Sequence, residues 1–221
     1  MPRSAEFQAR SIDEEPRLLE DSFRLRYQVY CLERHFLEAA DYPTGRETDE
    51  FDDDAIHLGV VDAEGQLAGT ARLIRANPRG FPMFQHCALF PEVQMLGTPH
   101  TVPVEVSRVA ISRHYVRSRQ RTEPFLTLVR AMVRGARYAG ATHLIGATDA
   151  ALHRWLVHFG LPYRVCGPSV DYYGQVSPCI MSLRELDEIV AAGQCPSLKG
   201  LGLEWKPDLS RRSADSGQAA W

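Results

Sequence analysis

The stretch VEVSRVAIS, residues 104–112, is typical of a buried strand but carries two ionisable side chains. Residues three apart on a regular strand face opposite sides, so Glu105 and Arg108 need an explanation. They could form an internal ion pair through a bulge, or the strand could line a cleft. A buried charge without a partner is costly. The stretch alone therefore leaves a structural ion-pair network and a functional site equally open.

The bulk composition indicates a soluble protein. The 221 residues are 44% hydrophobic and 24% charged, as in ordinary globular domains. The formal net charge of −3 does not favour nucleic acid or an anionic membrane as the main partner. The five cysteines lack paired spacing, the N-terminus is too polar for a signal peptide, and no apolar run reaches the roughly 18 residues of a membrane span. We therefore expect a cytoplasmic protein with reduced cysteines and no transmembrane segment.

The chain is predicted to form a single domain over residues 16–206, between a flexible lead-in (1–15) and a disordered polar tail (207–221). Its periodicity predicts, in order, a helix (16–36), an acidic loop (40–55), two strands (56–74), an irregular stretch with one short helix (75–103), a strand (104–112), a basic connection (113–124), a helix (125–140), a strand (142–149), a helix (150–160), two strands (162–183) and a helix (184–193). This order favours a mixed sheet covered by helices, an α/β or α+β fold.

The acidic loop contains Glu47, Asp49, Glu50, Asp52, Asp53 and Asp54. A solvated charge run is the usual meaning of such a pattern. A calcium loop is excluded, because DEFDDDAIHLGV has neither the glycine at position six nor the glutamate at position twelve of an EF-hand. A third possibility is a ligand-facing loop that binds a cationic substrate or meets Arg26, Arg72 and Arg108.

Motifs for metal binding and nucleophilic catalysis are missing from the sequence. The eight histidines, among them His57, His153 and His158, have no metal-ligand spacing, so we expect ordinary structural or surface histidines and no metal. There is no GxSxG, Walker A or GxGxxG motif. Ser107 has no base near it in the sequence, which argues against a serine nucleophile.

The basic connection and the helix after it concentrate arginine. The residues are Arg113, His114, Arg117, Arg119, Arg121, Arg130, Arg134 and Arg137. Surface arginine from a GC-rich genome is one explanation. A docking surface for a phosphate or an acidic partner protein is the other. Nucleic acid is not expected, because the stretch lacks interleaved aromatic residues and a known binding module.

Four motifs in order resemble the autoinducer-synthase branch of the GNAT acyltransferase superfamily. They are Arg26 with Tyr30, Asp49 with Asp52, Arg72 in GTARLIR, and Glu105-x-Ser107-Arg108. The resemblance covers roughly residues 16–183 and implies a GNAT-like, mostly antiparallel twisted sheet flanked by helices. Phe36 stands where acyl-homoserine-lactone synthases usually carry tryptophan. The segments YCLERHFLEA and DYYGQVSP look more like N-acyl amino acid synthases and the acyltransferases of exosortase and PEP-CTERM systems.

The resemblance implies a bacterial N-acyltransferase that moves a long fatty acyl group to the amine of an amino acid or similar small molecule. The glycine-rich pyrophosphate loop of acetyl-CoA enzymes is absent from RSRQRTEP. This implies the acyl-phosphopantetheine of an acyl carrier protein as donor, and no tightly bound cofactor. Three rivals remain, namely a lactone synthase using S-adenosylmethionine, an acetyl-CoA enzyme, and a non-catalytic binder of acyl carrier protein or acyl amines.

The resemblance also implies roles for individual residues. Glu105 would orient or deprotonate the amine, and Arg108 and Arg72 would complete the catalytic group. Backbone N–H groups where the strand splays would polarise the thioester carbonyl. The surrounding substrate-binding network would be Arg26, Tyr30, Phe36, Asp49, Asp52, Ser107 and Val109. The carrier-protein dock would be Arg113, Arg117, Arg119, Arg121, Arg130 and Arg134.

Overall fold

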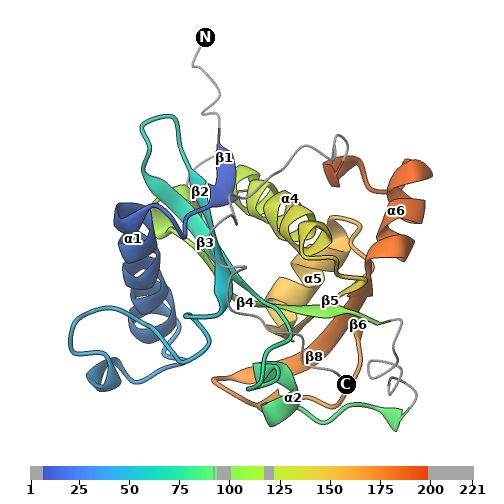
Figure 1. The fold of residues 1–221 in the computed structure, drawn as a ribbon, viewed down its shortest axis with the longest axis horizontal. Helices are drawn as coiled ribbons and strands as arrows, with labels where there is room; N and C mark the ends of the chain where they lie inside the picture. The colour runs from blue at the N-terminus through green and yellow to red at the C-terminus, as the bar shows by residue number, and fades with distance from the viewer. Residues whose placement is uncertain (1–6, 92, 94–100, 117–121, 199–221) are drawn as a thin grey trace.

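The structure is a computed structural model that describes residues 7–91, 93, 101–116 and 122–198. In this part of the chain, one eight-stranded sheet has the order β1-β2-β3-β4-β5-β8-β6, with β7 paired to β8 (Figure 1). The strands are β1 Gln8–Ser11, β2 Ala55–Val61, β3 Leu67–Ile74, β4 Pro103–Ile111, β5 His143–Asp149, β6 Arg164–Val165, β7 Val170–Asp171 and β8 Gln175–Ser182. All neighbours are antiparallel except β4 and β5. The predicted mixed, mostly antiparallel sheet is confirmed.

Helices cover the sheet. They are α1 Pro16–Tyr27, α2 Pro82–His86, α3 Arg113–Val116, α4 Glu123–Tyr138, α5 Ala150–His158 and α6 Leu183–Ala191. Figure 1 shows α1 and α4 on opposite sides of β2 and β3. A π-helical segment, Gln28–Glu33, continues α1. The region predicted as a single helix over 16–36 is therefore an α-helix followed by a π-helix. None of the described helices is long and apolar enough to cross a membrane.

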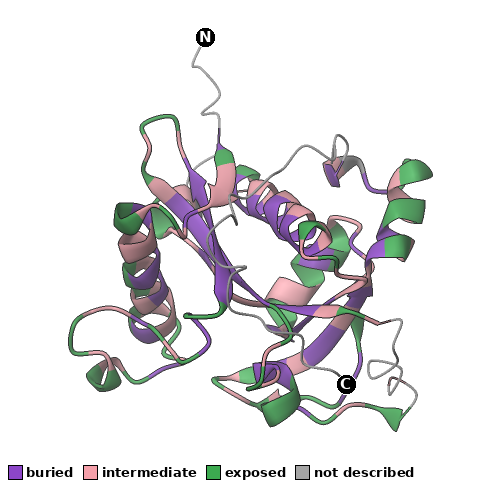
Figure 2. Cartoon of the chain, in the orientation of Figure 1, coloured by how far each residue is buried: buried purple, intermediate pink, exposed green. Residues whose placement is uncertain are grey.

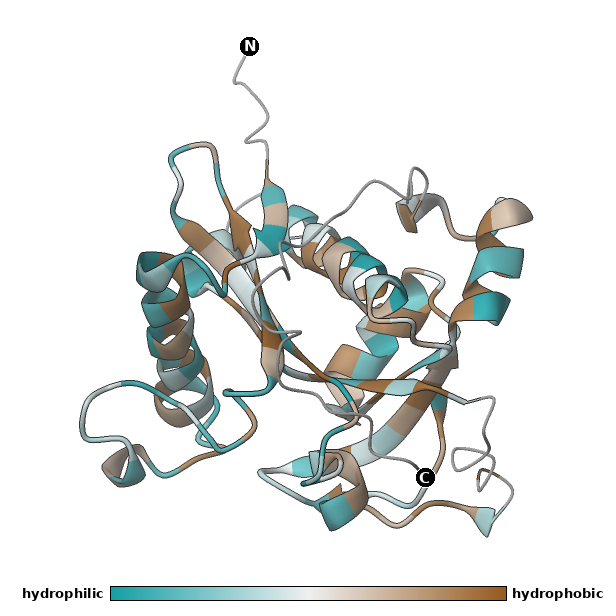
Figure 3. Cartoon of the chain, viewed as in Figure 1, coloured by the Kyte–Doolittle hydropathy of each residue, from teal (hydrophilic) through white to brown (hydrophobic). Residues whose placement is uncertain are grey.

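Nearly all residues of β2 and β3 are buried (Figure 2), and side chains of different chemistry lie on the two faces of these strands. Leu58 and Leu73 pack with Leu128 of α4 in the main apolar core. The alternate residues His57 and Arg72 point to the other face, beneath α1. Figure 3 shows hydrophobic residues concentrated in the central strands. The polar side chains on the α1 face therefore lie against an otherwise apolar sheet.

The strands β4 and β5 begin as neighbours and then separate. Their register pairs run only from Pro103–His143 to Glu105–Ile145. The close approach ends at Gly146, where a Cβ atom would lie 2.6 Å from the carbonyl oxygen of Val106. Beyond this point β4 follows β3 and β5 follows β8. The separation opens a space along the second half of β4.

Two predictions about the chain's organisation need correction. The lead-in predicted over 1–15 is wrong for Gln8–Ser11, which form β1 because this edge pairs with β2 and Ile12 is fully buried beside Leu18 and Val61. Residues 162–183 form three strands instead of two, because the chain turns back at Tyr172–Gly174. The tail predicted over 207–221 lies outside the described residues, and the single domain over 16–206 stays a prediction.

Candidate active site

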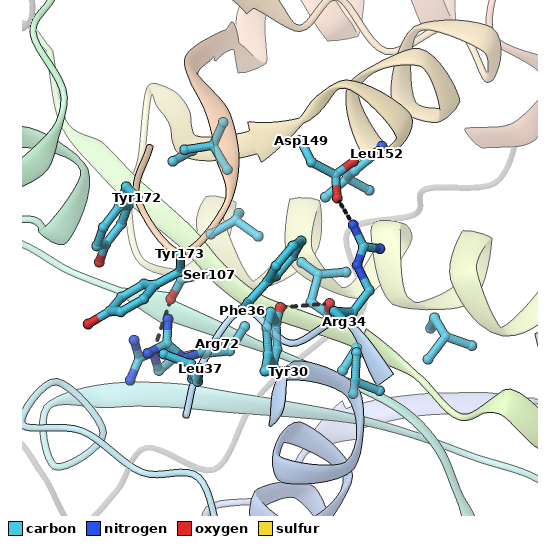
Figure 4. Close-up of a pocket in the computed structure, with 18 of the residues that line it drawn as sticks. Tyr30, Arg34, Phe36, Leu37, Arg72, Ser107, Asp149, Leu152, Tyr172 and Tyr173 are labelled. Atoms are coloured by element: carbon cyan, nitrogen blue, oxygen red, sulfur yellow. Dashed lines mark hydrogen bonds and ion pairs between the residues drawn. The ribbon is translucent and has the colours of Figure 1, made fainter. Parts of the chain in front are cut away.

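A cavity of about 380 Å³ lies where β4 separates from β5. Its lining includes the β4 residues from Glu105 to Ile111, Ala147 and Asp149 of β5, and the turn at Tyr172 and Tyr173. Figure 4 shows Tyr30, Phe36 and Arg34 approaching it from the segment that follows α1. Its volume and mostly apolar lining are typical of a small-molecule site.

The acidic loop supplies carboxylates to a buried ion cluster beside this cavity. Arg26 of α1 donates from Nε to Glu47 at 2.6 Å, and from Nη1 and Nη2 to Asp52 at 2.7 Å and 3.0 Å. Arg26 and Glu47 are 1% and 0% exposed. The solvated-run interpretation holds for Glu50, Asp53 and Asp54, which are exposed, and is wrong for the three carboxylates of the cluster, Glu47, Asp49 and Asp52.

Arg72 of β3 joins the loop to the central strand. Its Nη2 donates to Asp49 at 2.9 Å, its Nη1 donates to Asp52 at 2.8 Å and also to Asp49, and its Nε donates to Ser107 Oγ at 3.0 Å. Burial by itself raises the pKa of Asp52, but the hydrogen bonds from His57 and Arg26 dominate and hold it well below its ordinary value. Asp52 is thus held in its ionised form by its cationic partners.

A β-bulge explains how the charged side chain of Arg108 is accommodated in the apolar strand β4. A β-bulge shifts the β3–β4 register, so that Thr70 faces Ala110 while Arg72 faces Ser107. Within the bulge Arg108 has a φ of 53° and points to the acidic loop, where it bonds Glu47 at 3.0 Å and Asp49 at 2.9 Å. Burial lowers the pKa of Arg108, but Glu47 and Asp49 outweigh it and raise the pKa above its ordinary value. The bulge is present, but Arg108 bonds these two carboxylates and not Glu105.

Glu105, the other charged residue of the strand, has apolar neighbours and a backbone hydrogen bond. It lies in a row across four strands, Ala55–Ile74–Glu105–Ile145, in which its three neighbours are apolar. Its Oε2 accepts a hydrogen bond from the backbone N–H of Met83 at 3.0 Å. Burial raises the pKa of Glu105 to about 7, against the opposing effects of that hydrogen bond and of Arg72 and Arg108. A carboxyl group at the cavity wall thus exchanges its proton near neutral pH.

The predicted network residues on the segment after α1 also meet at the cavity. Tyr30 donates from its hydroxyl to the carbonyl oxygen of Val109 at 2.9 Å, and its ring lies 6.3 Å from that of Phe36. Burial raises the pKa of Tyr30 to about 12, so its hydroxyl stays protonated. Tyr30, Phe36 and Val109 thus lie with Ser107, Arg72 and Arg108 around one cavity (Figure 4).

Sequence reasoning missed two parts of the site. His57 was expected to be an ordinary histidine, but its ring nitrogens lie 2.8 Å from Asp13 and 3.1 Å from Asp52 inside the ion cluster. Its position directly opposite Arg72 in the β2–β3 hairpin is a signal that could have identified it. The segment DYYGQVSP was noted for its resemblance, but the place of Tyr172 and Tyr173 at the cavity was missed, because their contacts with His86 and Arg108 are distant in sequence.

The predicted docking arginines do not form one cluster in the described part of the chain. Arg113 lies at the cavity rim and pairs with Glu33 at 3.2 Å. Arg130 donates to the carbonyl oxygen of Ser197, and Arg134 is half-buried on the same helix. Arg117, Arg119 and Arg121 lie outside the described residues. The described chain contains no group of three or more side chains arranged to hold a metal ion.

Comparisons with known proteins agree with this geometry. Residues 25–126 match the model of the acetyltransferase (GNAT) domain family. The CoA-dependent acyl-homoserine lactone synthase BjaI, solved with SAM and isopentyl-CoA, is 21% identical with a TM-score of 0.65, over 87% of this chain and 90% of that one. FeeM, an N-acyl amino acid synthase from uncultured soil microbes, is 16% identical with a TM-score of 0.62, over 84% and 95%. The AHL synthase LasI is 22% identical with a TM-score of 0.59, over 81% and 90%. Residues 25–126 thus resemble the acetyltransferase (GNAT) domain, and the chain has the fold that these acyl-homoserine lactone synthases and FeeM share.

Proposed function

We propose that the protein is an N-acyltransferase that moves a fatty acyl group from a thioester to the amine of a carboxylate-bearing small molecule such as an amino acid. The observation that carries this proposal is Glu105, a buried carboxyl with a pKa raised to about 7 at the wall of an apolar cavity. A general base works best when its pKa lies near the working pH. An amine nucleophile needs such a base, because only its neutral form attacks.

The proposed reaction needs no covalent enzyme intermediate. The amine nitrogen attacks the thioester carbonyl carbon, and Glu105 takes the proton that the nitrogen loses. The carbonyl oxygen becomes negatively charged and receives hydrogen bonds from the β4 backbone N–H groups that no longer face β5. The C–S bond then breaks, the proton passes to the leaving thiolate, and an amide remains.

Arg108 supports a carboxylate on the acceptor. Its Nε and Nη2 bind Glu47 and Asp49, whereas its Nη1 has no hydrogen-bond partner among the described residues. The residue lines the cavity between the rings of Tyr30 and Tyr173, at 5.7 Å and 5.9 Å. A guanidinium with a spare nitrogen is a natural donor to a carboxylate. Arg72 and Arg26 would position Arg108 through their shared carboxylates.

The proposed donor is an acyl carrier protein. Among the predicted docking arginines that the structure describes, Arg113 is the one that lines the cavity, and its side chain is 56% exposed. BjaI is described as CoA-dependent, so acyl-CoA is the direct competitor for this role. The choice between the two is an outcome of the experiment.

The experiment measures thiol release from long-chain acyl carrier protein, long-chain acyl-CoA and acetyl-CoA. Pooled amino acids and S-adenosylmethionine serve as acceptors, and products are identified by mass. An amide product from the carrier-protein donor supports the proposal. Release from acetyl-CoA alone would make the protein a conventional acetyltransferase.

Glu105→Gln separates an enzyme from a binder. The variant should bind the acyl donor as the wild type does but lose amide formation. The matched control is Glu50→Gln, which changes an exposed carboxylate of the acidic loop. Donor binding without turnover in the wild-type protein would favour a sensor of acyl carrier protein.

A further inference from the structure

The imidazole of His57 is enclosed by two carboxylates on the side of the ion cluster that faces β1. Its Nδ1 lies 2.8 Å from Asp13 and its Nε2 lies 3.1 Å from Asp52, and its side chain is 4% exposed. A neutral imidazole has one donor and one acceptor nitrogen, so it cannot donate to both carboxylates. Burial lowers the pKa of His57, but its hydrogen bonds to Asp13 and Asp52 raise it above its ordinary value. The arrangement therefore holds an imidazolium ion.

With His57 charged, the buried cluster is electrically neutral. Its four cations are Arg26, Arg72, Arg108 and His57, and its four anions are Asp13, Glu47, Asp49 and Asp52. Each member is joined to the next by a hydrogen-bonded ion pair. Loss of the His57 charge would leave one uncompensated negative charge in a water-poor region, where charges interact strongly.

That charge would act on Glu105. His57 of β2 lies opposite Arg72 of β3, which lies opposite Ser107 of β4, two residues from Glu105. Two strand spacings across the sheet and two residues along it place His57 about 12 Å from Glu105 between Cα atoms. Among the charged groups near Glu105, Arg72 and Arg108 lower its pKa and Asp49 raises it. The titratable side chains Cys87 and Tyr172 also lie near it.

We infer that His57 and Asp13 form a remote positioning pair, which keeps the ion cluster neutral and thereby sets the pH at which Glu105 takes up its proton. The inference deepens the proposed function, since it concerns the base of that reaction. His57 acts through Asp52 and Arg72, because Arg72 lines the cavity and His57 is not among the lining residues. Asp13 acts through His57.

The test removes either one charge or both. His57→Gln leaves the cluster one negative charge in excess, because Asp13 keeps its hydrogen bonds from Ser11 Oγ and from the backbone N–H of residue 57. Asp13→Asn combined with His57→Gln restores neutrality. Glutamate labelled with ¹³C at the carboxyl carbon reports the titration of Glu105 by NMR, and the resonance is assigned by its loss in Glu105→Gln.

His57→Gln should raise the titration midpoint of Glu105 by about one pH unit, the effect of one charge at about 12 Å with an effective dielectric constant of about 20. The double variant should return it close to the wild-type value, although it removes more interactions than the single variant. A purely structural role predicts the opposite order. An unshifted midpoint in His57→Gln, or no return in the double variant, overturns the inference.

A second measurement uses the wild-type protein, so it tests the inference even if the variants fail to fold. The ¹⁵N shifts of the His57 ring should show protons on both nitrogens at pH 7, and a neutral ring there overturns the inference. Neither NMR measurement depends on turnover. Failure of the wild type to transfer an acyl group would refute the proposed function, while these titrations would still decide the role of His57.

Discussion

Glu105 accepts a hydrogen bond from the backbone N–H of Met83 across 3.0 Å, which joins the active-site strand to the start of α2. Met83 is fully buried, so the donor is fixed by packing. Among the described residues no arginine forms a hydrogen bond or an ion pair with this carboxylate, although Arg72 and Arg108 lie close enough to lower its pKa. The Glu105 carboxyl is therefore oriented by a backbone N–H group, and burial raises its pKa to about 7. Arg72 and Arg108 bond the acidic loop instead.

The ion cluster should contribute strongly to stability through Asp52. Asp52→Asn removes a carboxylate shared by Arg26, Arg72 and His57 and should lower the free energy of unfolding by about 3–5 kcal/mol. Urea unfolding at pH 7 measures it. The control is Asp54→Asn, which breaks an exposed pair with Arg79 in the same loop and should cost less than about 1 kcal/mol. Equal losses would refute the distinction.

The same carboxylate predicts a dependence of stability on pH. The pKa of Asp52 is lowered in the folded state, so the unfolded chain binds the proton more readily. The stability that Asp52 contributes is therefore present above about pH 4 and declines as the pH falls further. Unfolding measured between pH 3 and pH 7 should show this decline in the wild type and a weaker one in Asp52→Asn. Parallel curves would contradict the prediction.

Gly174 should control the shape of the cavity at the β7–β8 turn. Its φ is +99°, and a Cβ atom there would lie 2.8 Å from the Phe36 ring. Gly174→Ala should destabilise the protein by about 1–3 kcal/mol and raise the KM for the acceptor, because Phe36 has to move. Gly65→Ala is the control, since its φ is +76° and nothing lies within 4 Å of its Cβ position. Identical kinetics in the two variants would contradict this account.

Arg113 tests the carrier-protein donor. Arg113→Glu reverses a charge at the cavity rim and should raise the KM for acyl carrier protein on the order of tenfold. The KM for acyl-pantetheine, which carries no phosphate or protein, should change little. Arg164→Glu on β6 serves as the control for a distant exposed arginine. An equal effect on both donors would show that Arg113 shapes the rim and does not dock a carrier.

Much of this site could be predicted from the sequence. Residues 56–74 were predicted as two strands and form the β2–β3 hairpin, and the charges in VEVSRVAIS indicated that Glu105 and Arg108 need partners. The acidic loop was expected to meet Arg26, Arg72 and Arg108 as one of three alternatives, and it does so. These features depend on local patterns and on the cost of burying a charge alone.

The missed features depend on contacts between distant segments. Asp13 and His57 are 44 residues apart, and nothing around either residue indicates that β1 brings them together. The π-helical segment after α1 and Tyr173, which has a φ of 52°, both contribute residues to the cavity lining, and no local pattern predicted either feature. Long-range packing therefore decides which charges are paired, and so decides the chemistry of the site.

The most direct test of the account is the pH dependence of single-turnover amide formation, measured with saturating donor and acceptor. Burial raises the pKa of Glu105 to about 7, and the base acts only when ionised, so the rate should rise as the pH increases through about 7. Glu50→Gln should retain this profile. Glu105→Gln should lose on the order of 100-fold in rate, together with the rise near pH 7, while binding the donor normally. An unchanged rate and profile in Glu105→Gln would contradict the central claim that Glu105 takes the proton from the attacking amine.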